Sequence, residues 1–290
     1  MDHAVPKKVR CRAIADSDVD AVASLLCEGF PGRTRSHWLN GLARMRDRDV
    51  PAGHQRFGYA LDAGGQIVGV ILLICATRPT GDGQVPFTNA ASWYVAPEFR
   101  TYANLLVSIA MRNKDTTYLN VSAAPHTWPI VEQQGYARYC EGLFFAAAPL
   151  TVPVRGVSVE ELNEGHLSAL ASYDMLVRHR DYGCTVLVCR QGPVFTPFVF
   201  RRYAIRSGRV PLPAVQVIYA SDEKELVRLA GNLGRFLLRR GTPVVVMDAN
   251  GPVEGLRGVF TARRGRKYYK GPHRPALCDL ADTEFAIFGV

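Results

Sequence analysis

The sequence lacks the short motifs that mark several common classes of enzyme. Its 290 residues contain no P-loop, no glycine-rich dinucleotide fingerprint and no metal-ligand cluster. The seven cysteines are odd in number and include no C-x-x-C pair; Cys184 and Cys189, inside an apolar run, do not have a usual zinc spacing. We interpret the cysteines as buried, reduced thiols, which is typical of a reducing compartment.

Long apolar runs are missing as well. The longest one, "IVGVILLICA" from Ile67 to Ala76, is too short to span a bilayer and fits a buried strand better. The N-terminus "MDHAVPKKVRCR" is basic, but no apolar signal segment follows it. We therefore expect a soluble, cytoplasmic protein without a membrane partner.

The composition is that of a globular protein with excess positive charge. Apolar residues make up 48% of the chain and charged residues 21%, enough for one large domain or two ordinary ones. The formal net charge is +9, and the segment from Gly258 to Pro275 contains no acidic residue. Its basic side chains are Arg263, Arg264, Arg266, Lys267, Lys270 and Arg274. Because Tyr268 and Tyr269 lie among them, the segment fits either a nucleic-acid or phosphate site, or a solvated basic loop.

The order of expected elements predicts an α/β protein with a mixed sheet. In the first half we expect a strand at 9–14, helices at 17–30 and 32–47, and a hairpin within 56–78 that turns at "DAGGQ". A strand at 87–95, a helix at 102–113, a strand at 116–123, a short helix at 128–136 and a strand at 136–149 follow. The strand–helix–strand crossover implies two neighbouring parallel strands.

The second half begins again in a similar way after a proline-containing segment, Ala148 to Gly156. We expect helices at 158–179 and 221–241, with strands at 184–190, 196–205, 213–220, 242–249 and 283–290. The predicted domains are therefore 1–148 and 153–290.

The stretch "WYVAPEFRTYANLL" in the middle of the first half resembles the GNAT acyltransferase superfamily. Val95, Pro97 and Arg100 match the family's V-x-P-x-x-R/Q-x-x-G-x-G/A motif, whereas its two small positions hold Ala103 and Leu105. Gly135 and Tyr136 match the end of a second motif, Y-x-x-x-G-F, whose tyrosine position holds Val131. The resemblance covers about the first half of the chain and implies two tandem GNAT-like domains, the second one without a cofactor site.

The resemblance also implies a cofactor site. Members of the family transfer an acyl group from coenzyme A to an amine, with acetyl-CoA or another acyl-CoA as cosubstrate. The backbone N–H groups of a loop that enters a helix can hold the pyrophosphate, as in other phosphate sites. The implied site residues are Tyr94 and Val95 for the pantetheine arm, and Arg100, Thr101, Tyr102, Ala103, Asn104 and Leu105 for the phosphates.

The catalytic residues are not evident from the sequence. His126 follows an expected parallel strand and is a candidate base; Glu28 and Asp62 are further candidates. Direct attack by an amine needs no covalent nucleophile. Two hypotheses stay open: an N-acyltransferase, or a non-catalytic GNAT-like protein that binds acyl-CoA, nucleic acid or a protein partner.

Overall fold

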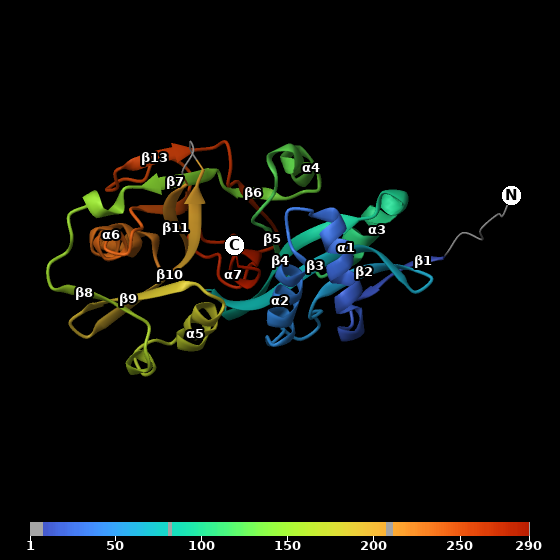
Figure 1. Ribbon diagram of the computed structural model, residues 1–290, viewed down its shortest axis with the longest axis horizontal. Helices are drawn as coiled ribbons and strands as arrows, with labels where there is room; N and C mark the ends of the chain where they lie inside the picture. The colour runs from blue at the N-terminus through green and yellow to red at the C-terminus, as the bar shows by residue number, and fades with distance from the viewer. Residues whose placement is uncertain (1–7, 81–82, 207–210, 290) are drawn as a thin grey trace. The chain divides into compact units, whose positions relative to one another are not determined.

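The structure is a computed structural model that describes residues 8–80, 83–206 and 211–289 (Figure 1). These residues divide into two compact units. The first contains the chain up to Asn120 together with Lys270–His273 and Asp282–Phe288. The second contains Val121–Tyr269 and Arg274–Ala281.

The first unit is built on a mixed sheet, as the sequence predicts. Its strands follow one another in space in the order β1, β2, β3, β4, β5, and all neighbours are antiparallel except the parallel pair β4–β5. The bounds are β1 Val9–Ala13, β2 Gly58–Ala63, β3 Gln66–Thr80, β4 Gly83–Val95 and β5 Thr117–Asn120. The expected hairpin turns at Gly64 and Gly65, whose φ angles of 66° and 92° favour glycine.

Helices α1 (Val19–Gly29) and α3 (Ala103–Ala110) pack on this sheet, and α2 (Arg35–Arg46) packs on α1. A short helix, α7 (Glu284–Ile287), returns to the same unit. The Oγ1 atom of Thr34 caps α2 by accepting a bond from the backbone N–H of His37 at 3.2 Å. Of the apolar residues that the sequence places at helical spacing in α2, Trp38, Leu42 and Met45 are buried, and Leu39 is half-buried.

The second unit carries a seven-stranded mixed sheet in the order β13-β7-β12-β11-β10-β9-β8. In chain order its strands are β7 Gly142–Ala146, β8 Val157–Glu161, β9 Thr185–Gln191, β10 Val194–Ile205, β11 Leu212–Ala220, β12 Val244–Ala249 and β13 Gly258–Thr261. The pair β6 (Ala137–Cys140) and β14 (Lys267–Lys270) is antiparallel. The helices of the second unit are α4 Trp128–Gln133, α5 Tyr173–Asp181 and α6 Glu223–Leu238. Helix α6 lies against the seven-stranded sheet (Figure 1).

The core under α6 follows from the sequence of that helix. Leu226, Leu229, Leu233 and Leu237 recur at helical spacing and are all buried against apolar residues of β9, β10, β11 and β12. Asp222 caps the helix by accepting a bond from the backbone N–H of Lys224 at 2.9 Å. Gly241, with a φ of 77°, follows the helix end.

The two units repeat one strand order. Strands β8 to β12 pair with one another as β1 to β5 do: three antiparallel pairs, then a parallel pair joined by a helix. Both copies also contain a bulge in the strand before that helix. The register skips Ser92 in β4, between Ala91 and Trp93, and Ile218 in β11, between Val217 and Tyr219. This repetition fits a tandem arrangement of two related domains.

Three expected elements are wrong. Residues 158–179 are not one helix, because strand β8 occupies Val157–Glu161 and α5 begins only at Tyr173. Asn163 interrupts the segment with a capped turn, in which its side chain accepts a bond from the backbone N–H of Gly165. The predicted strand at 283–290 is instead the helix α7; Val290 lies outside the described residues.

The strand expected at 136–149 is two strands, β6 and β7. The break falls at Glu141, whose backbone N–H donates to the side chain of Asn250 rather than to a neighbouring strand. A Cβ at Gly142 would lie 2.1 Å from the carbonyl oxygen of Thr261, so only glycine allows the two backbones to approach at this point. A continuous apolar pattern does not reveal such a break.

Candidate functional site

The strand β4 has an unpaired edge in the first unit. Its parallel pairing with β5 ends where Asn89 lies opposite Leu119, but β4 continues to Val95. Along Ala90–Val95 the described residues provide a partner strand only on the β3 side. We call Ala90–Val95 the free edge of β4. Unpaired backbone N–H and C=O groups along it are available to a ligand.

The bulge at Ser92 bends this edge. Ser92 has a φ of 44°, a left-handed value that is uncommon for a residue other than glycine. Bulges turn a strand and alter the direction of the next side chains, and Trp93 is 41% exposed just beyond this one. The backbone N–H of Ala96 donates to Val68 of β3 at 2.9 Å. Because the backbone N–H groups of successive residues in a strand point to opposite sides, the N–H of Val95 points away from β3, toward the free edge.

The segment after the free edge is helical rather than an open loop. Pro97–Tyr102 form a 3-10 helix that leads directly into α3, and the backbone N–H of Ala103 donates to the carbonyl oxygen of Arg100. The predicted site residues Arg100, Thr101, Tyr102, Asn104 and Leu105 are exposed along this segment, and Ala103 is half-buried. Leu105 does not point into the core; its exposed fraction is 39%.

A row of aromatic side chains begins at the free edge. A Cβ at Gly29 would lie 2.4 Å from Cγ of Tyr94, so glycine lets the end of α1 approach that ring. The ring of Phe30 lies 6.4 Å from Tyr94 and 5.5 Å from Trp38, and the His37 ring lies 5.0 Å from Trp38. Burial and the neighbouring Arg33 and Arg44 lower the pKa of His37, so its imidazole is neutral near pH 7.

Sequence reasoning missed this row. Its members come from the end of α1, from α2 and from β4, and helical spacing assigns Trp38 only to a core. Gly29 is a local sequence signal for the row, because a glycine in the last turn of an apolar helix permits a bulky side chain, here Tyr94, to pack closely against that turn.

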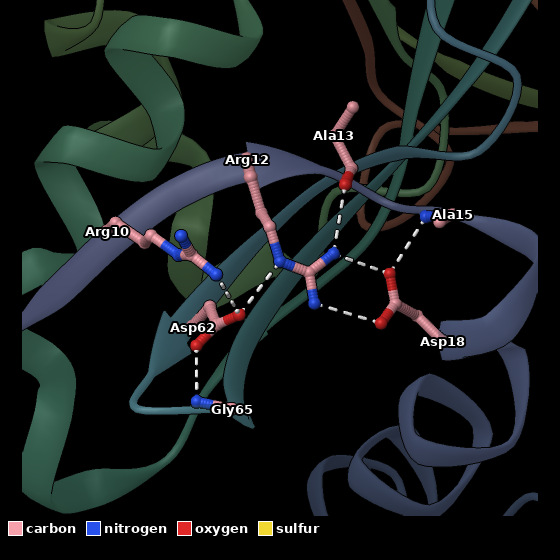
Figure 2. Close-up of polar contacts among 7 residues, drawn as sticks. All are labelled: Arg10, Arg12, Ala13, Ala15, Asp18, Asp62 and Gly65. Atoms are coloured by element: carbon pink, nitrogen blue, oxygen red, sulfur yellow. Dashed lines mark hydrogen bonds and ion pairs between the residues drawn. The ribbon is translucent and has the colours of Figure 1, made fainter.

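Asp62 serves the fold rather than proton transfer. Its carboxylate accepts bonds from Nε of Arg12 at 2.8 Å and from the backbone N–H of Gly65 at 2.7 Å, and Arg10 lies at 3.4 Å (Figure 2). Arg12 also bonds both oxygens of Asp18, at 2.6 and 2.9 Å. Hydrogen bonds from Arg12 and Gly65 lower the pKa of Asp62 to about 2, so it is a poor base near neutral pH.

The other two candidate bases, His126 and Glu28, are both exposed. His126 is exposed in a 3-10 helix, Pro125–Thr127, that belongs to the second unit. Glu28 is exposed on α1. Val131, at the tyrosine position of the second motif, is buried, as is Tyr136. These positions do not support a catalytic role for His126 or for Glu28.

Five of the seven cysteines are buried, as the sequence predicts, whereas Cys11 and Cys27 are half-buried. All seven are free, and burial raises the pKa of Cys75 and Cys140 to about 11 and that of Cys189 to about 12. These thiols are protonated at neutral pH and are therefore poor nucleophiles. Across residues 8–80, 83–206 and 211–289, no group of His, Cys, Asp and Glu could hold a metal ion.

The basic segment is less exposed than its composition predicts. Lys267 is buried, and its Nζ atom lies 2.7 Å from Oδ1 of the equally buried Asp248. Arg266 stacks on the ring of Trp128, with its guanidinium carbon 4.1 Å from the ring centroid. Arg263 and Arg264 are exposed. Lys267 therefore fits neither a ligand site nor a solvated loop, because it is paired with a buried carboxylate of its own unit.

The corresponding edge of the second unit is occupied. Pairing of β11 with β12 ends at Gln216, but Ala220 donates its backbone N–H to Cys278 at 3.0 Å, and Leu280 donates to Ile218 at 2.7 Å. A short peptide segment thus takes the place beside β11 that is unpaired beside β4. The first turn of α6 also contains two acidic residues, Glu223 and Glu225.

Comparisons with known proteins identify the fold of the chain. No protein-family model matches the sequence, and no curated protein matches it significantly. Solved structures do match over nearly the whole chain. A GCN5-related N-acetyltransferase from Kribbella flavida superposes with a TM-score of 0.56 at 17% identity, covering 90% of this chain and 70% of its own. The chain has the fold of the GCN5-related N-acetyltransferases.

Two further structures share this GNAT fold. A GCN5-related N-acetyltransferase from Anabaena variabilis has a TM-score of 0.58 at 10% identity, covering 90% of this chain and 72% of its own. The N-myristoyltransferase of Saccharomyces cerevisiae, solved with bound myristoyl-CoA, has a TM-score of 0.50 at 11% identity, covering 93% and 80%. Among the described residues, no helix has the length and apolar character needed to cross a membrane.

Proposed function

We propose that the protein is an acyltransferase that moves an acetyl or other acyl group from coenzyme A to an amine. The observation that carries the proposal is the free edge of β4, which leads directly into the helical segment at Arg100. The GNAT fold supports it, and so does the acyl-CoA bound to the yeast structure with the same fold.

The second unit supplies a physical argument for what the free edge binds. There, the bulged strand β11 holds a peptide segment through one N–H and one C=O group, those of Ala220 and Ile218. The pantetheine arm of coenzyme A contains two amide groups, which offer the same donors and acceptors as a peptide. We therefore propose that pantetheine runs along the free edge at Tyr94 and Val95, as the peptide does along β11.

The phosphates then fall near the start of α3. In the proposal, the pyrophosphate lies against Arg100, Thr101, Tyr102, Ala103, Asn104 and Leu105, all but one of which are exposed. The positive end of the helix dipole and the guanidinium of Arg100 attract the anion. The proposed domains are 1–148 for acyl-CoA and 153–290 for a second GNAT-like domain without a cofactor.

The transfer itself needs no covalent intermediate. A neutral amine attacks the thioester carbonyl carbon, the C–N bond forms as the C–S bond breaks, and the proton lost by the amine balances the charge of the thiolate. The backbone N–H of Val95 faces the free edge and is a candidate donor to the developing oxyanion. The proposal places the protein in the cytoplasm, where its seven free cysteines stay reduced.

Calorimetric titration with acetyl-CoA tests this proposal. Ala103→Glu adds bulk and negative charge beside the proposed phosphates, so we expect it to abolish binding while the thermal midpoint stays within a few degrees. Arg100→Ala removes one charge-assisted bond and is expected to weaken binding by ~1–2 kcal/mol. Arg112 is exposed just beyond the opposite end of α3, and Arg112→Ala is the matched control.

Two outcomes would redirect the proposal. If acetyl-CoA binds but no amine is acylated from a mixed panel, the non-catalytic alternative replaces the enzyme. If the wild-type protein has no affinity for acetyl-CoA or longer acyl-CoA at millimolar concentration, and Ala103→Glu changes nothing, the cofactor site is refuted.

A further inference from the structure

A cavity of about 630 Å³ opens in the second unit, on the face of the large sheet that α6 covers. Its size falls in the range of small-molecule sites. The residues that line it include both charged and apolar side chains, among them Glu161, Arg202, Ala204, Val215, Leu237 and Arg240.

The cavity exists because the hairpin of β10 and β11 is longer than the elements that cover it. Strand β9 begins at Thr185, opposite Phe200, so β10 extends beyond it with a partner on one side only. Helix α6 ends at Leu238. Among the residues that the structure describes, none therefore covers one face of the hairpin beyond Phe200. On that face Arg202 lies opposite Val215, and Ala204 lies opposite Pro213.

The floor of the cavity is apolar and continuous with the core. Val215 and Leu237 are 5% and 3% exposed and belong to the hydrophobic cluster beneath α6. Ala204 and Pro213 extend this surface outward. Because Ala204 and Pro213 are exposed, a ligand with an apolar body can bury that body here and remove these two residues from water.

The charges around the cavity leave one cation in excess. Arg240 and Glu161 both line it and form an ion pair, so their charges compensate each other. Arg202 is exposed, and its guanidinium has no hydrogen-bond or ion-pair partner among the described residues. The remaining lining side chains are uncharged. The excess of one positive charge beside an apolar floor suits a ligand with one negative charge.

From this arrangement we infer that the second unit binds a small monocarboxylate with an apolar body, such as a medium-chain acid. The carboxylate pairs with Arg202, and the apolar body covers Val215 and Ala204. The site shares no residue with the proposed acyl-CoA site, and it gives the second unit a ligand of its own.

The test uses dansyl-undecanoic acid, a fluorescent monocarboxylate, and its uncharged methyl ester, titrated against the full chain. We expect the acid to bind more tightly than the ester. Arg202→Ala should weaken the acid by about tenfold and leave the ester unchanged, since only the acid offers a charge to the guanidinium. Ala204→Trp should abolish binding of both probes by filling the cavity.

Arg206→Ala removes a nearby exposed arginine that does not line the cavity, and it should change neither affinity. A thermal midpoint close to that of the wild type shows that each variant is folded. The inference is overturned if the acid does not bind, if acid and ester bind equally, or if Arg202→Ala leaves the affinity for the acid unchanged. It is also overturned if Ala204→Trp still binds both probes.

Discussion

At the scale of single residues, the buried carboxylate of Asp62 makes stability depend on pH. Its folded pKa of about 2 is below the ordinary value, so the ionised form is favoured by folding. The stabilisation is fully present above the ordinary pKa and is lost as the pH falls from about 4 to about 2. We expect Asp62→Asn to lower the free energy of unfolding by ~1–2 kcal/mol at pH 7 and by little near pH 2.

Urea denaturation of wild type and variant at a series of pH values measures this difference. Asp20→Asn is the control, because Asp20 is 79% exposed in its pair with Arg35 and should contribute little. A difference for Asp62→Asn that is constant from pH 7 to pH 2 would show that its charge is not what matters.

The site residues could be predicted from the sequence only in part. The residues around Arg100 predict a strand that ends before a helix, and the structure has β4 followed by α3. The 3-10 helix of Pro97–Tyr102 was missed, because proline and glutamate at the start of a loop or of a helical turn look alike. The burial of Lys267 was missed because its partner Asp248 is distant in sequence.

At the scale of elements, the bulge in β4 places a strained residue at the proposed acyl-CoA site. Ser92 holds a φ of 44°, a conformation that glycine adopts freely and that β-branched residues avoid. We expect Ser92→Gly to leave stability unchanged or raise it by up to ~1 kcal/mol, and Ser92→Val to lower it by ~1–3 kcal/mol. Thermal unfolding followed by circular dichroism measures both.

The pair of variants also separates strain from side-chain contacts. Equal destabilisation by glycine and valine would mean that the hydroxyl group, rather than the backbone angle, matters at Ser92. If the bulge shapes the acyl-CoA site as proposed, Ser92→Gly keeps the affinity for acetyl-CoA.

Element types were predictable where the apolar pattern was long. The helix α6 has buried leucines at helical spacing over about three turns, and the hairpin of β2 and β3 has a two-glycine turn. Short segments failed, as at Glu284–Ile287, where four residues fit either helix or strand. There a distant side chain decides: Oδ1 of Asn89 accepts the backbone N–H of Glu284 at 2.8 Å and so satisfies a free donor of the first turn.

At the scale of the whole molecule, the repeated strand order could be suspected from the sequence but not established by it. The two halves share no evident residue-level repeat, because a fold constrains the pattern of apolar residues more than their identity. The structure reveals the repeat through the same order of strand pairing in both units and through the bulges at Ser92 and Ile218. The strands β6 and β7, separated only by Glu141, could not be told apart by pattern.

The repeat leads to a prediction about stoichiometry that rests on the proposed function. Two related edges exist, but the one at β11 already holds its own peptide through Ala220 and Ile218. Acidic residues in the first turn of α6, Glu223 and Glu225, oppose a pyrophosphate there. We expect calorimetry with acetyl-CoA to give one site per chain, and Ala103→Glu to remove all of it. The double variant Glu223→Gln, Glu225→Gln should not create a second site, because the peptide still fills the edge. A stoichiometry of two, or residual binding in Ala103→Glu that this double variant strengthens, would assign acyl-CoA to the second unit as well.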